Sequence, residues 1–246
     1  GILYTIIIFC GIYAEVGIRE RFINFSSASE TADNVETHAL QFRSAVIFEL
    51  IMCCSDVGVA IILGAILLYQ ATLKAGTTAN ASSSVLMIAL SCIFRLMQTS
   101  IIASNLLHMF AASLILDPSL SAVTVAGSDL KDMCTLDCED QGRSSVALAE
   151  ALALLFLSIQ KYGYTLALVF FGVSLFFLGT IIVVDHNVNN KLFPHYLGWA
   201  CILAGFGYVL DALMYFLWDG YNGEVSSYFM LPVLVADSFG WRVGYC

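Results

Sequence analysis

The stretch SCIFRLMQTSIIASNLLHMF, residues 91–110, is apolar enough to cross a lipid bilayer, yet it carries Arg95 close to its start. Gln98, Asn105 and His108 follow within the same run. A membrane-spanning helix needs about 20 predominantly apolar residues. A charge within such a helix is expected to face other helices rather than lipid. The stretch therefore predicts a membrane helix that turns a polar stripe toward the inside of a bundle.

The composition extends this interpretation to the whole chain. Of the 246 residues, 59% are hydrophobic and 12% are charged, whereas an average soluble domain has about 25% charged residues. Mean hydropathy is +0.85. We therefore predict an all-α fold, a single polytopic transmembrane helical bundle of about six helices that covers residues 1–246.

The charge balance narrows the expected partners. The net charge is −9, from ten Lys or Arg against nineteen Asp or Glu. This acidity argues against nucleic acid, which binds basic surfaces, and against attachment to anionic lipid through a polybasic patch. We expect membrane lipids and other membrane protein subunits as partners. We also expect a multi-pass integral membrane location, which would be an organellar inner membrane if the chain is eukaryotic.

The apolar runs place the expected spans at about residues 2–18, 44–69, 85–116, 164–184 and 196–218. The run 146–184 is too long for one span, because a helix of that length would measure roughly 58 Å against a hydrocarbon core of about 30 Å. We expect a break near Gly163, preceded by an interfacial or bundle-packed helix; the alternative is one helix that projects from the membrane. A weaker apolar run, 227–246, is interpreted as a half-span or sixth helix.

Two loops stand out. In the polar first loop, residues 19–43, we expect a short helix over residues 29–42 that is capped by Ser27 or Ser29; Ser27 and Glu30 fit a capping box. The acidic third loop, residues 117–143, has six acids and two bases. It also contains Cys134 and Cys138, which can form a disulfide if the loop faces an oxidising compartment and otherwise stay free thiols.

Three acidic residues in other spans are candidate partners for Arg95. Glu49 and Asp56 are seven residues apart and share a helix face, and Asp211 lies in the last long span. We expect Arg95 to pair with one or two of these carboxylates. The predicted intramembrane polar cluster comprises Glu49, Asp56, Arg95, Gln98, Asn105 and Asp211. Such a cluster either fixes helix packing or lines a cavity for a ligand or a proton, and the sequence leaves both open.

Catalytic signatures are missing from the sequence: it has no G-x-S-x-G, no P-loop and no H-E-x-x-H. The four histidines are too scattered to predict a metal or haem site. We therefore expect no enzyme activity, no cofactor and no metal.

Several short motifs occur together in a characteristic order. They are T-A-x-N at residues 31–34, Phe42-Arg43, Asp56, Phe94-Arg95, Gly163, Phe170-Phe171-Gly172, Gly179, Pro194, Leu197-Gly198 and G-x-G-Y-x-x-D at residues 205–211. Over about residues 7–217 the chain resembles the multi-pass membrane proteins of domain-of-unknown-function family 4386, known mainly from bacteria. The resemblance implies a six-helix bundle and no established reaction. The chain departs from the family's pattern in two places: before the T-A-x-N segment, and in the third loop, which looks like an insertion.

The sequence supports two main hypotheses of function. The first is a structural or accessory subunit of a larger membrane protein complex, with the acidic loop as a docking surface. The alternative is a small transporter, or a protein that binds a lipid, quinone or pigment through the intramembrane polar cluster.

Overall fold

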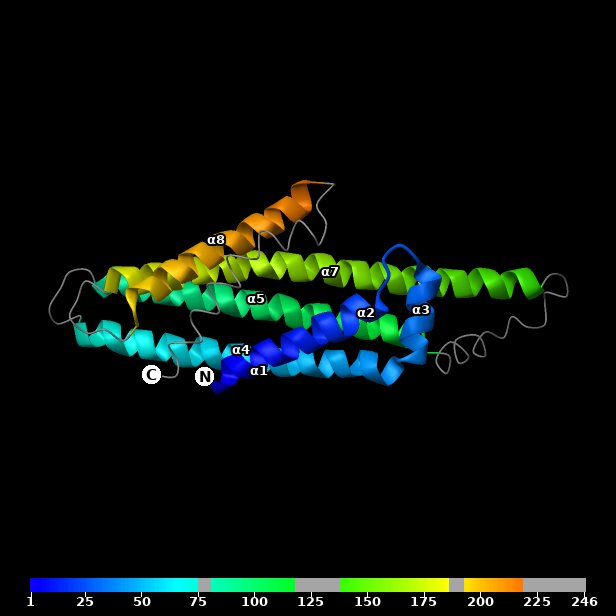
Figure 1. Cartoon of the computed structure of the whole chain (residues 1–246), viewed down its shortest axis with the longest axis horizontal. Helices are drawn as coiled ribbons and strands as arrows, with labels where there is room; N and C mark the ends of the chain where they lie inside the picture. The colour runs from blue at the N-terminus through cyan, green and yellow to red at the C-terminus, as the bar shows by residue number, and fades with distance from the viewer. Residues whose placement is uncertain (75–80, 118–137, 186–192, 219–246) are drawn as a thin grey trace. The chain divides into compact units, whose positions relative to one another are not determined.

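The computed structural model describes residues 1–74, 81–117, 138–185 and 193–218, and the regular structure in these ranges is entirely helical (Figure 1). Five helical stretches in this part of the chain are long and apolar enough to cross a membrane: Ile2–Phe22, Ala39–Thr72, Ser83–Ile115, Val146–Val184 and His195–Leu217. The predicted all-α membrane-type bundle is confirmed. The weak apolar run 227–246, proposed as a sixth helix, lies outside the described residues.

The first apolar stretch is built from three consecutive pieces. These are α1 (Ile2–Ile12), the π-helical η1 (Tyr13–Arg19) and α2 (Glu20–Phe22). The helix therefore continues past the end expected at about residue 18, and it takes Arg19 out of the predicted first loop. The wider π turn carries Glu15 and Arg19, and π-helical segments inside α-helices occur frequently at functional sites.

A capped helix, α3 (Ala28–Thr37), follows in the polar first loop. Ser27 is its N-cap in extended conformation, and its Oγ accepts a hydrogen bond from the Glu30 backbone N–H at 3.3 Å. The predicted serine half of the capping box is confirmed. The glutamate half is wrong, because Glu30 Oε2 accepts from the Asn24 amide at 2.7 Å. Asn24 precedes the cap in the same turn and offers a side-chain donor within reach.

Three long helices and one shorter helix follow. They are α4 (Ala39–Lys74, 36 residues), α5 (Ala81–Ile115, 35 residues), α7 (Cys138–Asp185, 48 residues) and α8 (His195–Leu217). The prediction of a break near Gly163 is wrong, since α7 runs through it. A Cβ at Gly163 would overlap the amide of Asn105 on α5, so the glycine allows the Asn105 side chain to lie close to the α7 backbone.

The described residues group into two compact units. The first unit takes residues 1–4, 55–102 and those from 164 onward; the second takes residues 5–54 and 103–163. The core of the first unit centres on Leu67, Ala71, Ile88, Leu178, Ile181 and Ile182. The core of the second unit is larger and includes Ile18, Phe22, Phe42, Met109, Leu116 and Leu157.

In the first unit, α7 and α8 pack with their backbones close together. A Cβ at Gly172 would lie 2.6 Å from the carbonyl oxygen of Gly205, and one at Gly179 would lie 2.5 Å from that of Gly198. Small residues at a helix interface allow this separation, which is typical of membrane helix pairs. This close packing holds Phe171 and Tyr208 where they reach the candidate site described next.

Candidate functional site

The central polar group of the first unit is an ion pair between α4 and α5. Arg95 donates to Asp56 Oδ1 from both Nε, at 3.0 Å, and Nη2. Thr99, one turn after Arg95, donates from Oγ1 to the other carboxylate oxygen at 2.7 Å. The side chains of Arg95 and Asp56 are only 5% and 7% exposed. The predicted pairing of Arg95 with Asp56 is confirmed, and both oxygens of the carboxylate have hydrogen-bond donors.

Two aromatic rings cover the guanidinium. The Cζ atom of Arg95 lies 5.2 Å from the ring centre of Phe171 on α7 and 5.8 Å from that of Tyr4 on α1. Phe171 in turn makes an edge-on contact with Tyr208 of α8, with ring centres 5.1 Å apart. Cation–π attraction is strongest when the cation is desolvated, so this arrangement favours a buried charge.

One turn before Arg95, α5 is joined to α7 by a pair of serines. Ser91 Oγ donates to the backbone carbonyl of Ser174 at 3.0 Å, and Ser174 Oγ donates to that of Ser91 at 2.9 Å. Both residues are buried. Hydrogen bonds of this kind join membrane helices without placing a charge in the hydrocarbon region.

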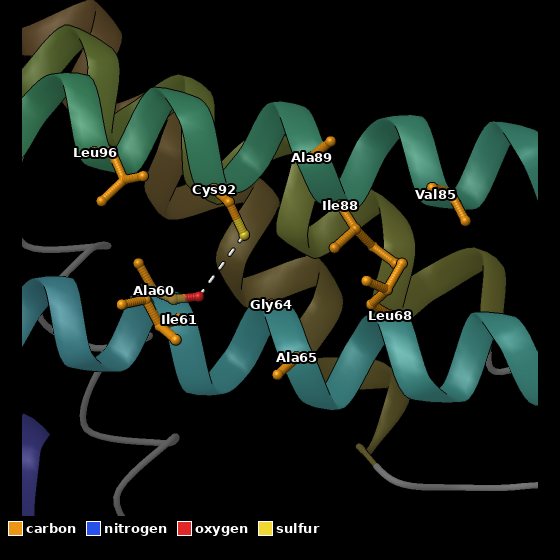
Figure 2. A pocket seen from close by; sticks show the side chains of 10 residues that line it. All are labelled: Ala60, Ile61, Gly64, Ala65, Leu68, Val85, Ile88, Ala89, Cys92 and Leu96. Atoms are coloured by element: carbon orange, nitrogen blue, oxygen red, sulfur yellow. Dashed lines mark hydrogen bonds between the residues drawn. The ribbon is translucent and has the colours of Figure 1, made fainter.

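The first unit also has a groove between α4 and α5, with a volume of about 310 Å³ (Figure 2). We call it the α4–α5 groove. The ten residues that line it are labelled in Figure 2, and all are aliphatic or glycine except Cys92. The Cys92 thiol points from α5 toward α4 and donates to the carbonyl of Ala60 at 3.7 Å. The groove therefore suits an apolar occupant.

The second unit has its own buried ion pair. Glu49 of α4, which is 1% exposed, pairs with Arg19 Nη2 at 2.8 Å. Arg19 also pairs with Glu15, whose side chain is 44% exposed. Arg95 therefore pairs with one of the three predicted carboxylates, Asp56, and the candidate Glu49 pairs with Arg19 instead. Two carboxylates seven residues apart on one helix, Glu49 and Asp56, have different arginine partners in the two units.

Three polar atoms on α5 are buried without a hydrogen-bond partner among the described residues. In the first unit this atom is Gln98 Oε1; in the second unit the two atoms are Asn105 Nδ2 and His108 Nδ1. Gln98 and Asn105 belong to the predicted polar cluster, and both are buried. The sixth member, Asp211, is buried in α8 of the first unit.

The remaining site predictions have separate outcomes. Cys134 and the side chain of Cys138 lie outside the described residues, so the disulfide stays a prediction. Within the part of the chain that the structure describes, no three His, Cys, Asp or Glu side chains are grouped to hold a metal ion.

The sequence analysis missed Arg19, Thr99 and Ser174. Thr99 was detectable, since it lies one turn after Arg95 on the same helix. Arg19 follows the first apolar run, so the sequence predicted it in a loop. The π turn brings it within 2.8 Å of Glu49, and no motif in the sequence marks that turn. Ser174 pairs with a residue 83 positions away, so local spacing does not reveal it.

The described residues form a helical bundle with five apolar stretches and buried ion pairs, which defines a multi-pass, membrane-type helical protein. The model of the family named Domain of unknown function (DUF4386) matches residues 1–241, so the chain belongs to this family. The resemblance noted in the sequence is thereby confirmed over nearly the whole chain. Comparison with curated proteins gave no match. Comparison with solved structures likewise gave none.

Proposed function

We propose that this chain is a non-catalytic structural subunit of a larger membrane protein assembly, and that the α4–α5 groove receives a transmembrane helix of a partner subunit. The observation that carries the proposal is the groove itself. Four of its lining residues have small side chains or none: Ala60, Gly64, Ala65 and Ala89. Small residues let the backbone of a neighbouring membrane helix approach closely, and van der Waals packing then holds the two helices together.

The Arg95–Asp56 pair supports a structural role for the polar cluster. An ionisable residue inside a membrane is often part of a substrate or ion pathway. Here Asp56 receives Arg95 on one carboxylate oxygen and Thr99 on the other, and aromatic rings lie against the guanidinium. A substrate would have to displace one of these contacts. The pair therefore fits a contact that sets the register of α4 against α5.

A second candidate function is lipid binding in the same groove. Its aliphatic lining suits an acyl chain as well as a helix. The two functions differ in what occupies the groove after purification. A structural subunit keeps a protein partner, whereas a lipid-binding protein keeps a lipid and can be monomeric.

The test is the native mass of the protein extracted from its own membrane in mild detergent, with associated proteins identified by mass spectrometry. We expect a larger assembly with fixed stoichiometry. Ala89→Phe should release the chain from it, because the phenyl ring fills the groove at an exposed alanine. Ala103→Phe is the matched control, an exposed alanine of α5 outside the groove, and should leave the assembly intact.

A wild-type protein that runs alone, or only as a small homo-oligomer, contradicts the structural-subunit proposal. In that case bound lipid is measured by mass spectrometry. Loss of one lipid species in Ala89→Phe but not in Ala103→Phe would support the lipid-binding function instead.

A further inference from the structure

The second unit contains an asparagine whose amide is buried against a glycine. Asn105 on α5 is 7% exposed, and its Nδ2 has no hydrogen-bond partner among the described residues. A Cβ at Gly163 on α7 would overlap both the amide nitrogen and the amide oxygen. The absence of a side chain at Gly163 therefore makes the room in which this polar group lies.

A second polar atom without a partner lies one turn further along α5. His108 Nδ1 is buried and has no hydrogen-bond partner in the described part of the chain. The imidazole ring lies 6.1 Å from the ring of Phe156 on α7, centre to centre. Phe156 and Gly163 are seven residues apart, so they share a face of α7. Asn105 and His108, three residues apart on α5, are neighbours on the face that meets it.

Both atoms belong to α5, whose apolar stretch Ser83–Ile115 is long enough to cross a membrane. Hydrocarbon offers no hydrogen bonds, so polar groups in this environment need internal partners. We propose that Asn105 and His108 form a binding site for a single hydroxyl oxygen, from either water or a lipid hydroxyl group. The oxygen accepts a hydrogen bond from Asn105 Nδ2 and donates one to His108 Nδ1.

The hydrogen-bonding capacities of Asn105 Nδ2 and His108 Nδ1 favour a hydroxyl oxygen as the ligand. Asn105 Nδ2 is a donor only, whereas Nδ1 of a neutral imidazole protonated at Nε2 is an acceptor. A cation is unsuitable, because the amide N–H groups would repel it. A carbonyl oxygen satisfies Asn105 but leaves the histidine nitrogen without a donor. A hydroxyl oxygen both accepts and donates, so it completes the two groups at once.

The test is a double-mutant cycle on the full-length protein in mild detergent, with Asn105→Leu, His108→Phe and the double variant compared by thermal unfolding. We expect each single variant to lower the Tm by roughly 2–4 °C for each hydrogen bond lost. The double variant should lower it by little more than one single variant, because the bridging oxygen is lost in either case.

The matched control is Gln98, the other side-chain amide of α5 with a buried atom that lacks a hydrogen-bond partner among the described residues. Gln98 is ten residues from His108, about 15 Å along the helix, too far for a shared oxygen. The effects of Gln98→Leu and His108→Phe on the Tm should therefore add. If Asn105→Leu raises the Tm, the amide had no partner and the proposal is overturned; additive effects of Asn105→Leu and His108→Phe overturn it as well.

Two further measurements complete the test. If the variants do not fold, nitrogen-15 NMR of histidine-labelled wild-type protein reports on His108 Nδ1. An Nδ1 resonance typical of a hydrogen-bonded nitrogen supports the site, and a resonance typical of an unbonded nitrogen overturns it.

Repeating the double-mutant cycle after exhaustive removal of lipid identifies the source of the oxygen. Coupling that survives delipidation indicates water, and coupling that disappears indicates a lipid hydroxyl; either result supports the site.

Discussion

The Arg95 guanidinium contacts Asp56 through two of its nitrogens, and both side chains are nearly inaccessible to solvent. Such a pair is costly to break from one side only, because the remaining charge stays buried without a counter-charge. Its value to the protein is therefore tested most clearly by comparing single and paired replacements.

Arg95→Met should destabilise the protein by about 3–5 kcal/mol, since it leaves the Asp56 carboxylate buried with the Thr99 hydroxyl but without a counter-charge. The paired variant Arg95→Met with Asp56→Leu should recover most of this loss, because no charge then remains. Thermal or denaturant unfolding in a fixed detergent measures both. If the paired variant is as unstable as Arg95→Met alone, the ion pair contributes more than charge compensation.

Glu49→Gln and Glu15→Gln should differ in effect although both remove a partner of Arg19. Glu49 is buried, but Arg19 keeps Glu15 as a counter-charge when Glu49 is replaced. The replacement should therefore destabilise the protein by about 1.5–3 kcal/mol, the contribution of one hydrogen bond to a charged group. Glu15 is partly exposed, and exposed ion pairs contribute about 0.2–1 kcal/mol. Unfolding of the two variants under one set of conditions checks the order. If the two variants lose equal stability, Glu15 contributes more to the ion pair with Arg19 than its exposure indicates.

Gly172→Ala and Gly179→Ala should each destabilise the α7–α8 pair by about 1–3 kcal/mol, because the added Cβ meets a backbone carbonyl of α8 that cannot move alone. Gly17→Ala is the matched control. A Cβ there lies 3.6 Å from the Tyr13 ring, an ordinary contact, and alanine favours a helix over glycine by about 1 kcal/mol. A loss of stability in Gly17→Ala comparable to that in Gly172→Ala would argue against the steric explanation.

Ser27→Ala should destabilise α3 by about 1 kcal/mol, because the Glu30 backbone N–H loses its acceptor. Hydrogen exchange of the first-turn amides of α3 should accelerate, while exchange in α5 stays unchanged. Glu30→Gln keeps an acceptor for Asn24 and should have a smaller effect. Faster exchange throughout the chain would show that Ser27 supports more than this one helix.

The apolar helices were predictable from local composition, and their bounds were mostly right. The exceptions are instructive. The length of the apolar run 146–184 indicated a break near Gly163, yet α7 continues through it. Asn105 on α5 lies in the space that this glycine leaves, a contact between distant residues that the run itself does not reveal. The first helix runs on through a π turn, so Arg19 lies within the apolar helical stretch Ile2–Phe22 instead of the loop.

The sequence by itself determined that this chain forms an all-α bundle of membrane-type helices, and that its buried polar residues include Glu49, Asp56 and Arg95. Periodicity along one helix is a local property, so the sequence contains it directly. The tertiary structure decided that Asp56 binds Arg95 and that Glu49 binds Arg19. Glu49 and Asp56 have the same chemistry and share a helix face. Only the position of the neighbouring helices along α4 distinguishes them, and that position depends on contacts between residues far apart in the chain.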